Sequence, residues 1–347
     1  MTALDLSGKA SAGIFDCAFG NGIGGGPSGM GRRRFLMLGA AGFAGAAFAA
    51  EGASGAPAFD DALTALISDI HVTGREYEDR PAKYANDLFL KMVDEILALR
   101  PRPRRVVAFG DVAQFFGREG DYAEAAKGFG RLAAAGIETV ITTGNHDHRE
   151  AMFARFPEIA KRSPVPGRAV AVVDLGHADL LLLDSLQESD KGPGSLNPGG
   201  GTLDDAQWDW LESEAKRRTR PFFVGSHHSV NELRRGGRTL LSALSPLPLF
   251  KGYIHGHEHF WQKGHRVRGW DGVGTSRRFL RVLCLPSTGY WGDIGFALMR
   301  TAKDRAVVSL EMRDFIVYGH TNTTPLRPPE HDMMLEERSG ETCTFLF

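Results

Sequence analysis

The sequence predicts an α/β fold in which a largely parallel sheet is flanked by helices and a second sheet has more antiparallel character. Short apolar runs alternate with stretches of helical periodicity in the first part of the folded region, which is typical of parallel strands joined by helices. Closely spaced apolar runs follow near the carboxyl end. The length of 347 residues is sufficient for one large domain with a full core.

The first part of the fold is predicted from apolar spacing and from the residues that break it. Leu88, Met92 and Ile96 recur at helical spacing, and Pro101 ends that helix because proline cannot continue its hydrogen bonding. Gly136 closes a second, alanine-rich helix. The expected elements are strands at 63–67, 106–109 and 137–141, and helices at 82–100 and 122–135.

The second part contains more strands and fewer helices. Asp204 has the character of a helix cap, with Trp208 and Leu211 on the buried face of the helix that follows. Residues 187–202 are rich in glycine, proline, serine and charge, so we expect a mobile surface loop there. The expected elements are helices at 150–156 and 204–218, strands at 169–173, 180–183, 222–224 and 252–254, and a second sheet from 279–285, 296–299 and 306–310.

The amino-terminal segment has the parts of an export signal. Arg32-Arg33-Arg34-Phe35-Leu36 precedes a short, glycine-interrupted apolar stretch that ends in small residues near Ala49. This order resembles a twin-arginine signal and predicts a periplasmic or secreted protein that meets a membrane only through the signal. Met30, directly before the arginines, is a candidate start of translation. We therefore expect a leader at 1–58, a folded domain at 59–318 and a carboxyl-terminal tail at 319–347.

The composition narrows the possible partners. With 41 basic and 42 acidic residues, the chain lacks the positive charge by which proteins hold nucleic acid, so a nuclease is a minor hypothesis. Cys17, Cys284 and Cys343 form neither a paired framework nor a Cys-x-x-Cys site. A disulfide between Cys284 and Cys343 is possible but is not required by the sequence.

Five polar motifs follow apolar runs. They are Ser68-Asp69-Ile70-His71, Gly110-Asp111, Gly144-Asn145-His146-Asp147, Ser226-His227-His228 and Gly256-His257-Glu258-His259. Residues two apart in extended chain point to the same side, so Asp69 with His71, and His257 with His259, can bind one ion together. Carboxylate, amide and imidazole donors suit transition metals better than Ca²⁺ or Mg²⁺. Each motif alone is a common turn, but their joint occurrence predicts a metal site.

On these motifs the sequence resembles the calcineurin-like metallophosphoesterases over roughly residues 62 to 300. The resemblance implies a four-layer β-sandwich flanked by helices over the domain at 59–318, and a dinuclear centre of divalent or trivalent Mn, Fe or Zn ions. It implies that one ion binds Asp69, His71, Asp111 and His259, and that the other binds Asp111, Asn145, His227 and His257.

The resemblance also implies roles for residues around the metals. The nucleophile would be a metal-bound hydroxide, and His146 would lie beside the phosphate, where it stabilises developing charge or protonates the leaving oxygen. His227 is preferred over His228 as the ligand because relatives keep the first histidine of such a pair. Gln114 stands where many relatives have an acidic residue that orients the motif histidine.

The predicted function is hydrolysis of small phosphoesters, with phosphodiesters favoured. A phosphomonoesterase and a non-catalytic relative that binds metal and phosphate stay open as alternatives, the latter because of Gln114. Arg234, Arg235 and Arg238 are interpreted as a solvated loop, or as a selector of anionic substrates if they border the metals. Seven of the 12 histidines, His255 among them, fall at these strand ends, and the other five are interpreted as surface or packing residues; they are His148, His177, His265, His320 and His331.

Overall fold

The computed structural model describes residues 58–74, 80–268, 279–289, 292–312, 317–318, 325–326 and 339–347. The chain divides into two compact units between Ser54 and Gly55, and every described residue belongs to the second unit. The expected export signal lies outside the described residues. Among the helices that are described, none is long and apolar enough to span a membrane.

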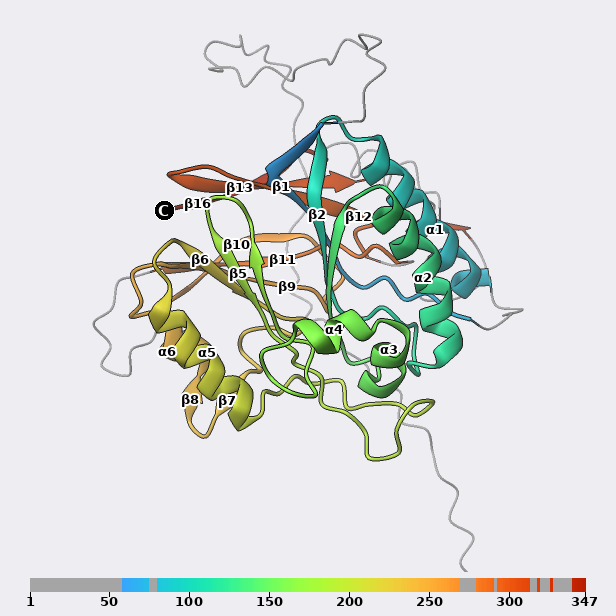
Figure 1. Ribbon diagram of the computed structural model, residues 1–347, viewed down its shortest axis with the longest axis horizontal. Helices are drawn as coiled ribbons and strands as arrows, with labels where there is room; N and C mark the ends of the chain where they lie inside the picture. Colours follow the sequence, from blue (N-terminus) through green and yellow to red (C-terminus); the bar gives the residue numbers. More distant parts are fainter. Residues whose placement is uncertain are drawn as a thin grey trace, which may run out of the picture. The chain divides into compact units, whose positions relative to one another are not determined.

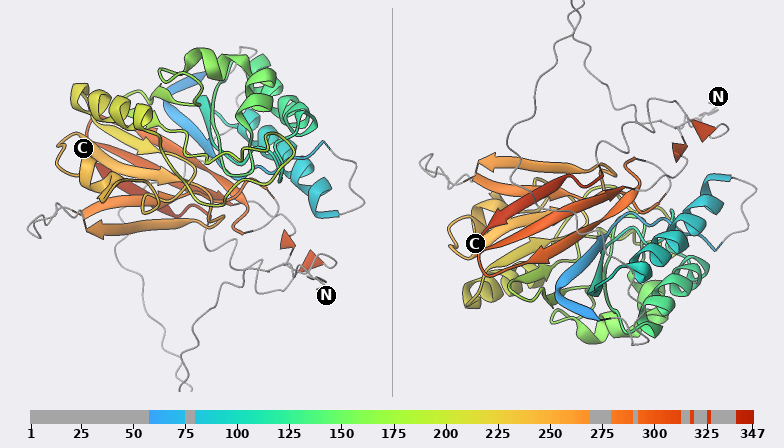
Figure 2. Two further views of the ribbon diagram at one scale, coloured as in Figure 1. Left: turned by 90° about the horizontal axis from the view of Figure 1, so that it is seen from below. Right: turned by 90° about the horizontal axis from the view of Figure 1, so that it is seen from above.

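Two six-stranded sheets pack face to face and carry helices on their outer faces (Figures 1 and 2). The first sheet has the order β16-β13-β12-β1-β2-β3 and the second has the order β10-β11-β9-β6-β5-β4. This arrangement confirms the predicted α/β sandwich with helices outside. The strands of the first sheet are β1 (Phe59–Ile67), β2 (Arg102–Phe109), β3 (Glu138–Thr142), β12 (Gly295–Thr301), β13 (Arg305–Met312) and β16 (Thr342–Leu346).

The second sheet has a parallel centre with an antiparallel strand at each edge. Strands β5, β6, β9 and β11 run parallel, while β4 and β10 pair antiparallel with their neighbours. Its strands are β4 (Ala171–Asp174), β5 (Asp179–Leu182), β6 (Phe222–Gly225), β9 (Phe250–His255), β10 (Gln262–Arg268) and β11 (Phe279–Cys284). Two short hairpins are formed by β7 (Arg234–Arg235) with β8 (Arg238–Thr239), and by β14 (Val317–Tyr318) with β15 (Pro325–Leu326).

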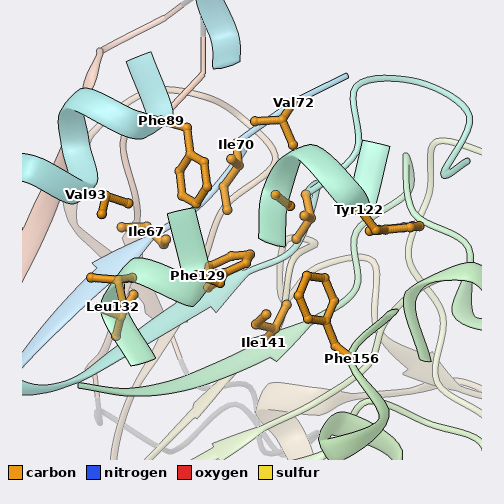
Figure 3. Packing of buried hydrophobic residues seen from close by; sticks show 14 of the residues in the cluster. Ile67, Ile70, Val72, Phe89, Val93, Tyr122, Phe129, Leu132, Ile141 and Phe156 are labelled. Carbon is orange, nitrogen blue, oxygen red and sulfur yellow. The ribbon is translucent and has the colours of Figure 1, made fainter. Parts of the chain in front are cut away.

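Three buried layers of side chains hold the sandwich together. The strand alternation places Ala65 and Ile67 against the helices of the first sheet, and Leu66 between the sheets. Figure 3 shows the first layer, where Phe89 and Phe129 pack edge to face with ring centres 5.2 Å apart. The helices on the first sheet are α1 (Arg80–Ala98), α2 (Glu119–Ala134), α3 (Arg149–Arg155) and α4 (Pro157–Arg162), and those on the second are α5 (Asp205–Arg217) and α6 (Leu240–Leu244).

Most predicted elements are found near the predicted places, but α6, β7, β8, β10, β14 and β15 were not predicted, and further differences concern sheet membership, the tail and one more helix. Strands β12 and β13 extend the first sheet antiparallel to β1, whereas the sequence analysis assigned them to a second sheet. The segment expected as a tail contains β16, which pairs with β13. Helix α4 is absent from the prediction; it begins at Pro157, the position where proline is tolerated in a helix. Cys284 and Cys343 are buried and free, so the possible disulfide is not formed.

Candidate metal centre

The predicted ligands gather at the carboxyl ends of strands from both sheets. Asp69, Asp111 and Asn145 follow β1, β2 and β3, which are parallel neighbours and therefore end side by side. His227 and His257 follow β6 and β9, which are parallel neighbours in the second sheet. Ligand sites in open α/β sheets lie at this end of the strands. The topology thus brings together motifs separated by up to 190 residues (69 to 259).

The backbone at this centre is strained. A left-handed φ in a residue other than glycine is uncommon and costs about 1–3 kcal/mol, so such residues cluster at functional sites. Among the described residues, all five non-glycine residues with positive φ are predicted ligands. They are Asp69 (53°), His71 (53°), Asp111 (48°), His257 (72°) and His259 (61°).

One group of ligand atoms comes from Asp69, His71 and His259. The Nε2 atoms of His71 and His259 lie 3.1 Å apart, and Asp69 Oδ1 lies 3.3 Å from His259 Nε2. His71 Nδ1 faces the backbone carbonyl of Gln114 at 3.3 Å, so it can donate its N–H there and keep the Nε2 lone pair toward the group. All three ligand side chains are buried. A cation fits this convergence of two imidazoles and a carboxylate.

A second group is centred on His227. Its Nε2 lies 3.2 Å from Asp111 Oδ2, 3.2 Å from Asn145 Oδ1 and 3.3 Å from His257 Nδ1. Asp111 Oδ2 also lies 3.8 Å from His71 Nε2, in the first group. One carboxylate oxygen therefore borders both groups, as a bridging ligand would. The donor set and its convergence fit transition-metal binding.

The charges of these groups are set by burial and by one another. Burial, together with the neighbouring His259 and His146, lowers the pKa of His71 to about 3, so its ring is neutral as a ligand must be. Burial would raise the pKa of Asp111, but the imidazoles of His227 and His146 outweigh it and hold that pKa well below its usual range. Burial likewise opposes charge on His227, but Asp111 raises its pKa to about 9, so a metal must displace that proton.

His146 lies at the edge of this centre. Its Nε2 is 3.9 Å from Asp111 Oδ2, and its side chain is 24% exposed, whereas Asp111 is 2% exposed. The ring packs edge-on against His71 and Phe115, with centre-to-centre distances of 5.1 and 5.6 Å. This position suits contact with a substrate that approaches the buried ligands from outside.

His228 lies behind its neighbour. Its Nδ1 is 2.8 Å from Ser185 Oγ, and among the described ring contacts it packs against His227 and His257. The nitrogen atoms of these three histidines come within 4.8 Å of one another. His227, however, is the one that contacts both Asp111 and Asn145. The choice of His227 rather than His228 as the ligand stays a prediction.

The structure adds residues that the sequence analysis did not select. Asp147 accepts hydrogen bonds from the backbone N–H groups of Val112, Ala113 and Gly144, and so joins the second motif to the third. Tyr122 donates its hydroxyl to the same carboxylate at 3.2 Å. The only signal for Asp147 is its place in the third motif.

Two arginines of the cluster formed by Arg234, Arg235 and Arg238 form ion pairs with helix α5. Arg235 pairs with Asp209 at 2.6 Å, and Arg238 pairs with Glu212, both on α5. These contacts favour the solvated loop over the anion selector. His148, expected as a surface or packing residue, is buried and lies 3.2 Å from Glu188. His265, His320 and His331 have no described side chains.

Gly256→Ala should weaken metal binding without unfolding the protein. A Cβ at this position would lie 1.8 Å from Ser68 Oγ and 2.7 Å from Asp69 Oδ2, so the Asp69 carboxylate must move. We expect about a tenfold or greater loss of Mn²⁺ affinity, measured by calorimetric titration. Gly237→Ala is the matched control, since a Cβ there meets no atom within 4 Å. Equal affinities in both variants would contradict the assignment of Asp69.

Comparison with known proteins identifies the family. Residues 63–260, more than half of the chain, match the family described as calcineurin-like phosphoesterase. No curated protein matches the chain.

The solved structures to which this chain is similar are distant in sequence. One described as PhoD is 11% identical with a TM-score of 0.49, over 73% of this chain and 66% of that chain, slightly under two thirds of its length. Vps29 from Chaetomium thermophilum is 12% identical with a TM-score of 0.35, over 82% of this chain and 96% of that one. Zinc-bound Vps29 from Entamoeba histolytica is 13% identical with a TM-score of 0.33, over 72% and 92%. On the family match, the chain belongs to the calcineurin-like phosphoesterases.

Proposed function

We propose that this protein hydrolyses small phosphoesters, preferably diesters, at a dinuclear metal centre. The observation that carries the proposal is the position of Asp111 Oδ2, which lies 3.2 Å from His227 Nε2 and 3.8 Å from His71 Nε2 and so borders both ligand groups. When bound, two ions at such a centre activate water and neutralise phosphate charge. Asp69, His71, Asp111 and His259 would hold one ion, and Asp111, Asn145, His227 and His257 the other.

The chain's own side chains would hold the centre in place and assist departure of the leaving group. The buried ligands keep the centre rigid and exclude water from its inner side. His146, the more exposed neighbour of Asp111, is placed to donate a hydrogen bond or a proton to the leaving oxygen. Both histidines of the last motif, His257 and His259, are present, and this pair is found in relatives that act on small diesters and in relatives that act on monoesters.

The proposal is tested by a comparison of two esters. Purified protein with Mn²⁺, Fe²⁺ or Zn²⁺ is given bis(4-nitrophenyl) phosphate or 4-nitrophenyl phosphate, and release of nitrophenolate is followed. We expect turnover that requires the metal and has a higher kcat/KM for the diester. A higher value for the monoester would make the protein a phosphomonoesterase instead.

A non-catalytic protein that binds metal and phosphate is the second candidate. The observation in its favour is Gln114, a buried amide where the family resemblance implies an acid in many relatives; its Oε1 has no hydrogen-bond partner among the described residues. Without a carboxylate there, His146 is a weaker acid catalyst. Two bound metals with no hydrolysis of either ester would favour this candidate.

We also propose that the protein is exported. The twin-arginine order at Arg32-Arg33-Arg34-Phe35-Leu36 supports this location. Replacement of Arg32 and Arg33 with lysine should keep the precursor in the cytoplasm, as measured by fractionation and immunoblotting of cells that express the chain with its native amino terminus. Arg34→Lys, at the variable position, is the control and should be exported. Normal processing of the double variant would contradict the proposal.

A further inference from the structure

A residue of the long surface loop holds the segment that carries His146. Asn197 Nδ2 donates to the backbone carbonyl of Asn145 at 2.9 Å and to that of Asp147 at 2.7 Å. These two carbonyls flank His146 on either side. Asn197 Oδ1 accepts from the backbone N–H of Ser189 at 2.8 Å. The amide orientation follows from these partners, since the reverse orientation would place an oxygen against two carbonyls.

The ring of His146 packs against His71 and Phe115, but these contacts are not hydrogen bonds. Its Nδ1 is buried and has no hydrogen-bond partner among the residues the structure describes. Gln114, an amide, stands where the family resemblance implies an orienting acid in many relatives. The backbone N–H of His146 donates to Asp111 Oδ1 at 2.9 Å. The direction of the ring therefore depends on its packing against His71 and Phe115 and on how firmly its backbone is held, and Asn197 holds the carbonyls of the residues before and after it.

The loop that carries Asn197 is itself anchored. The backbone N–H of Gly194 donates to the carbonyl of Phe116 at 2.8 Å, and the Ser195 carbonyl lies 3.0 Å from His148 Nε2. Gly201 donates its N–H to Glu232 at 2.8 Å. The expectation of a mobile loop was based on composition alone, whereas these contacts tie residues 194–201 to three other segments. A rigid support of this kind is what a catalytic side chain requires.

We propose that Asn197 is a positioning residue for His146. The proposal rests on the proposed hydrolase function and adds that reactivity depends on a side chain outside the five motifs. Loss of the two hydrogen bonds would let the loop at 145–147 shift and would carry His146 Nε2 away from the reacting oxygen. A displacement of about 1 Å can reduce a rate by about a hundredfold.

The kinetic test combines Asn197 and His146 substitutions. Asn197→Ala removes the two donors, and Asn197→Asp keeps the size and the Ser189 contact but places an oxygen against the carbonyls. We expect kcat for bis(4-nitrophenyl) phosphate to fall by about tenfold or more in each, with KM changed by less than about twofold. In the His146→Ala background the same substitutions should change kcat by less than about twofold, because the group that they position is gone.

A control and a second measurement separate positioning from general destabilisation. Ser195→Ala removes only a contact within the loop, from Ser195 Oγ to the Gly192 carbonyl, and should leave kcat unchanged. In the protein with His146 intact, the ring NMR signals of His146 should shift or broaden when Asn197 is replaced with alanine. The ring signals of His177 should not change. This reading does not need turnover, so it tests the inference even if the protein hydrolyses neither ester. Equal kcat losses in both backgrounds, or an unaltered His146 signal, would overturn the proposal.

Discussion

Asp111→Asn should reduce phosphoester hydrolysis by about a thousandfold and should release metal on dialysis. The substitution keeps the size of the side chain but removes the charge that both ligand groups face, through Oδ2 at 3.2 Å from His227 and 3.8 Å from His71. Charge stabilisation by metal ions contributes several kcal/mol to a transition state, and about 1.4 kcal/mol corresponds to a factor of ten. The measurements are kcat and metal content by mass spectrometry.

The control for this substitution is Asp179→Asn. Asp179 is also buried and charged, but it lies on β5 and pairs with Arg218 and Arg220. The Asp179→Asn variant should be less stable than the wild type but should keep its metals and its activity per folded molecule. Full activity of the Asp111 variant, with both metals retained, would remove the bridging role and the dinuclear centre that depends on it.

Arg149→Leu should lower the free energy of unfolding by about 3–5 kcal/mol. Arg149 binds Asp184 through two hydrogen bonds of 2.8 and 2.7 Å and reaches Glu188 at 2.9 Å. Burial raises the pKa of Asp184, but Arg149 outweighs this and keeps that carboxylate charged. Removal of the guanidinium leaves a buried charge without its partner. Urea denaturation monitored by circular dichroism measures the loss.

Arg235→Leu is the matched control for the buried pair. Its partners Asp205 and Asp209 are mostly exposed, with side-chain exposures of 81% and 69%, whereas Asp184 is 0% exposed. Exposed ion pairs contribute about 0–1 kcal/mol, so this variant should unfold close to the wild type. A loss of similar size in both variants would show that burial of the Arg149 pair has no special energetic role.

The sequence predicted the parts of the fold that are encoded locally. Each motif follows an apolar run, and the parallel arrangement of β1, β2 and β3 brings the ends of these runs together. The partner of a strand is not encoded in this way. The apolar run that forms β12 does not indicate that it pairs with β1. The pairing of Leu66 with Ala297 joins segments more than 200 residues apart, and it depends on which edge of the sheet is free to accept a strand.

The residues that hold the site in place, such as Asn197, could not be predicted from the sequence for a related reason. Residues 187–202 have the composition of a mobile loop, and an anchored loop has the same composition because its anchors are a few single contacts. Asn197 and Glu188 are such anchors, and neither belongs to a periodic pattern. The predicted ligands are brought together by the structure, but their roles in metal binding and catalysis stay predictions until the variants are measured.

The two-sheet origin of each ligand group has a consequence for how the protein matures. Asp69 and His71 follow a strand of one sheet and His259 follows a strand of the other, and the same division separates Asp111 from His227. Neither half of the sandwich can assemble a complete site by itself. Catalytic competence should thus arise late in folding, in one step with the closing of the interface between the halves, and a chain arrested before that step would be inert as well as unstable.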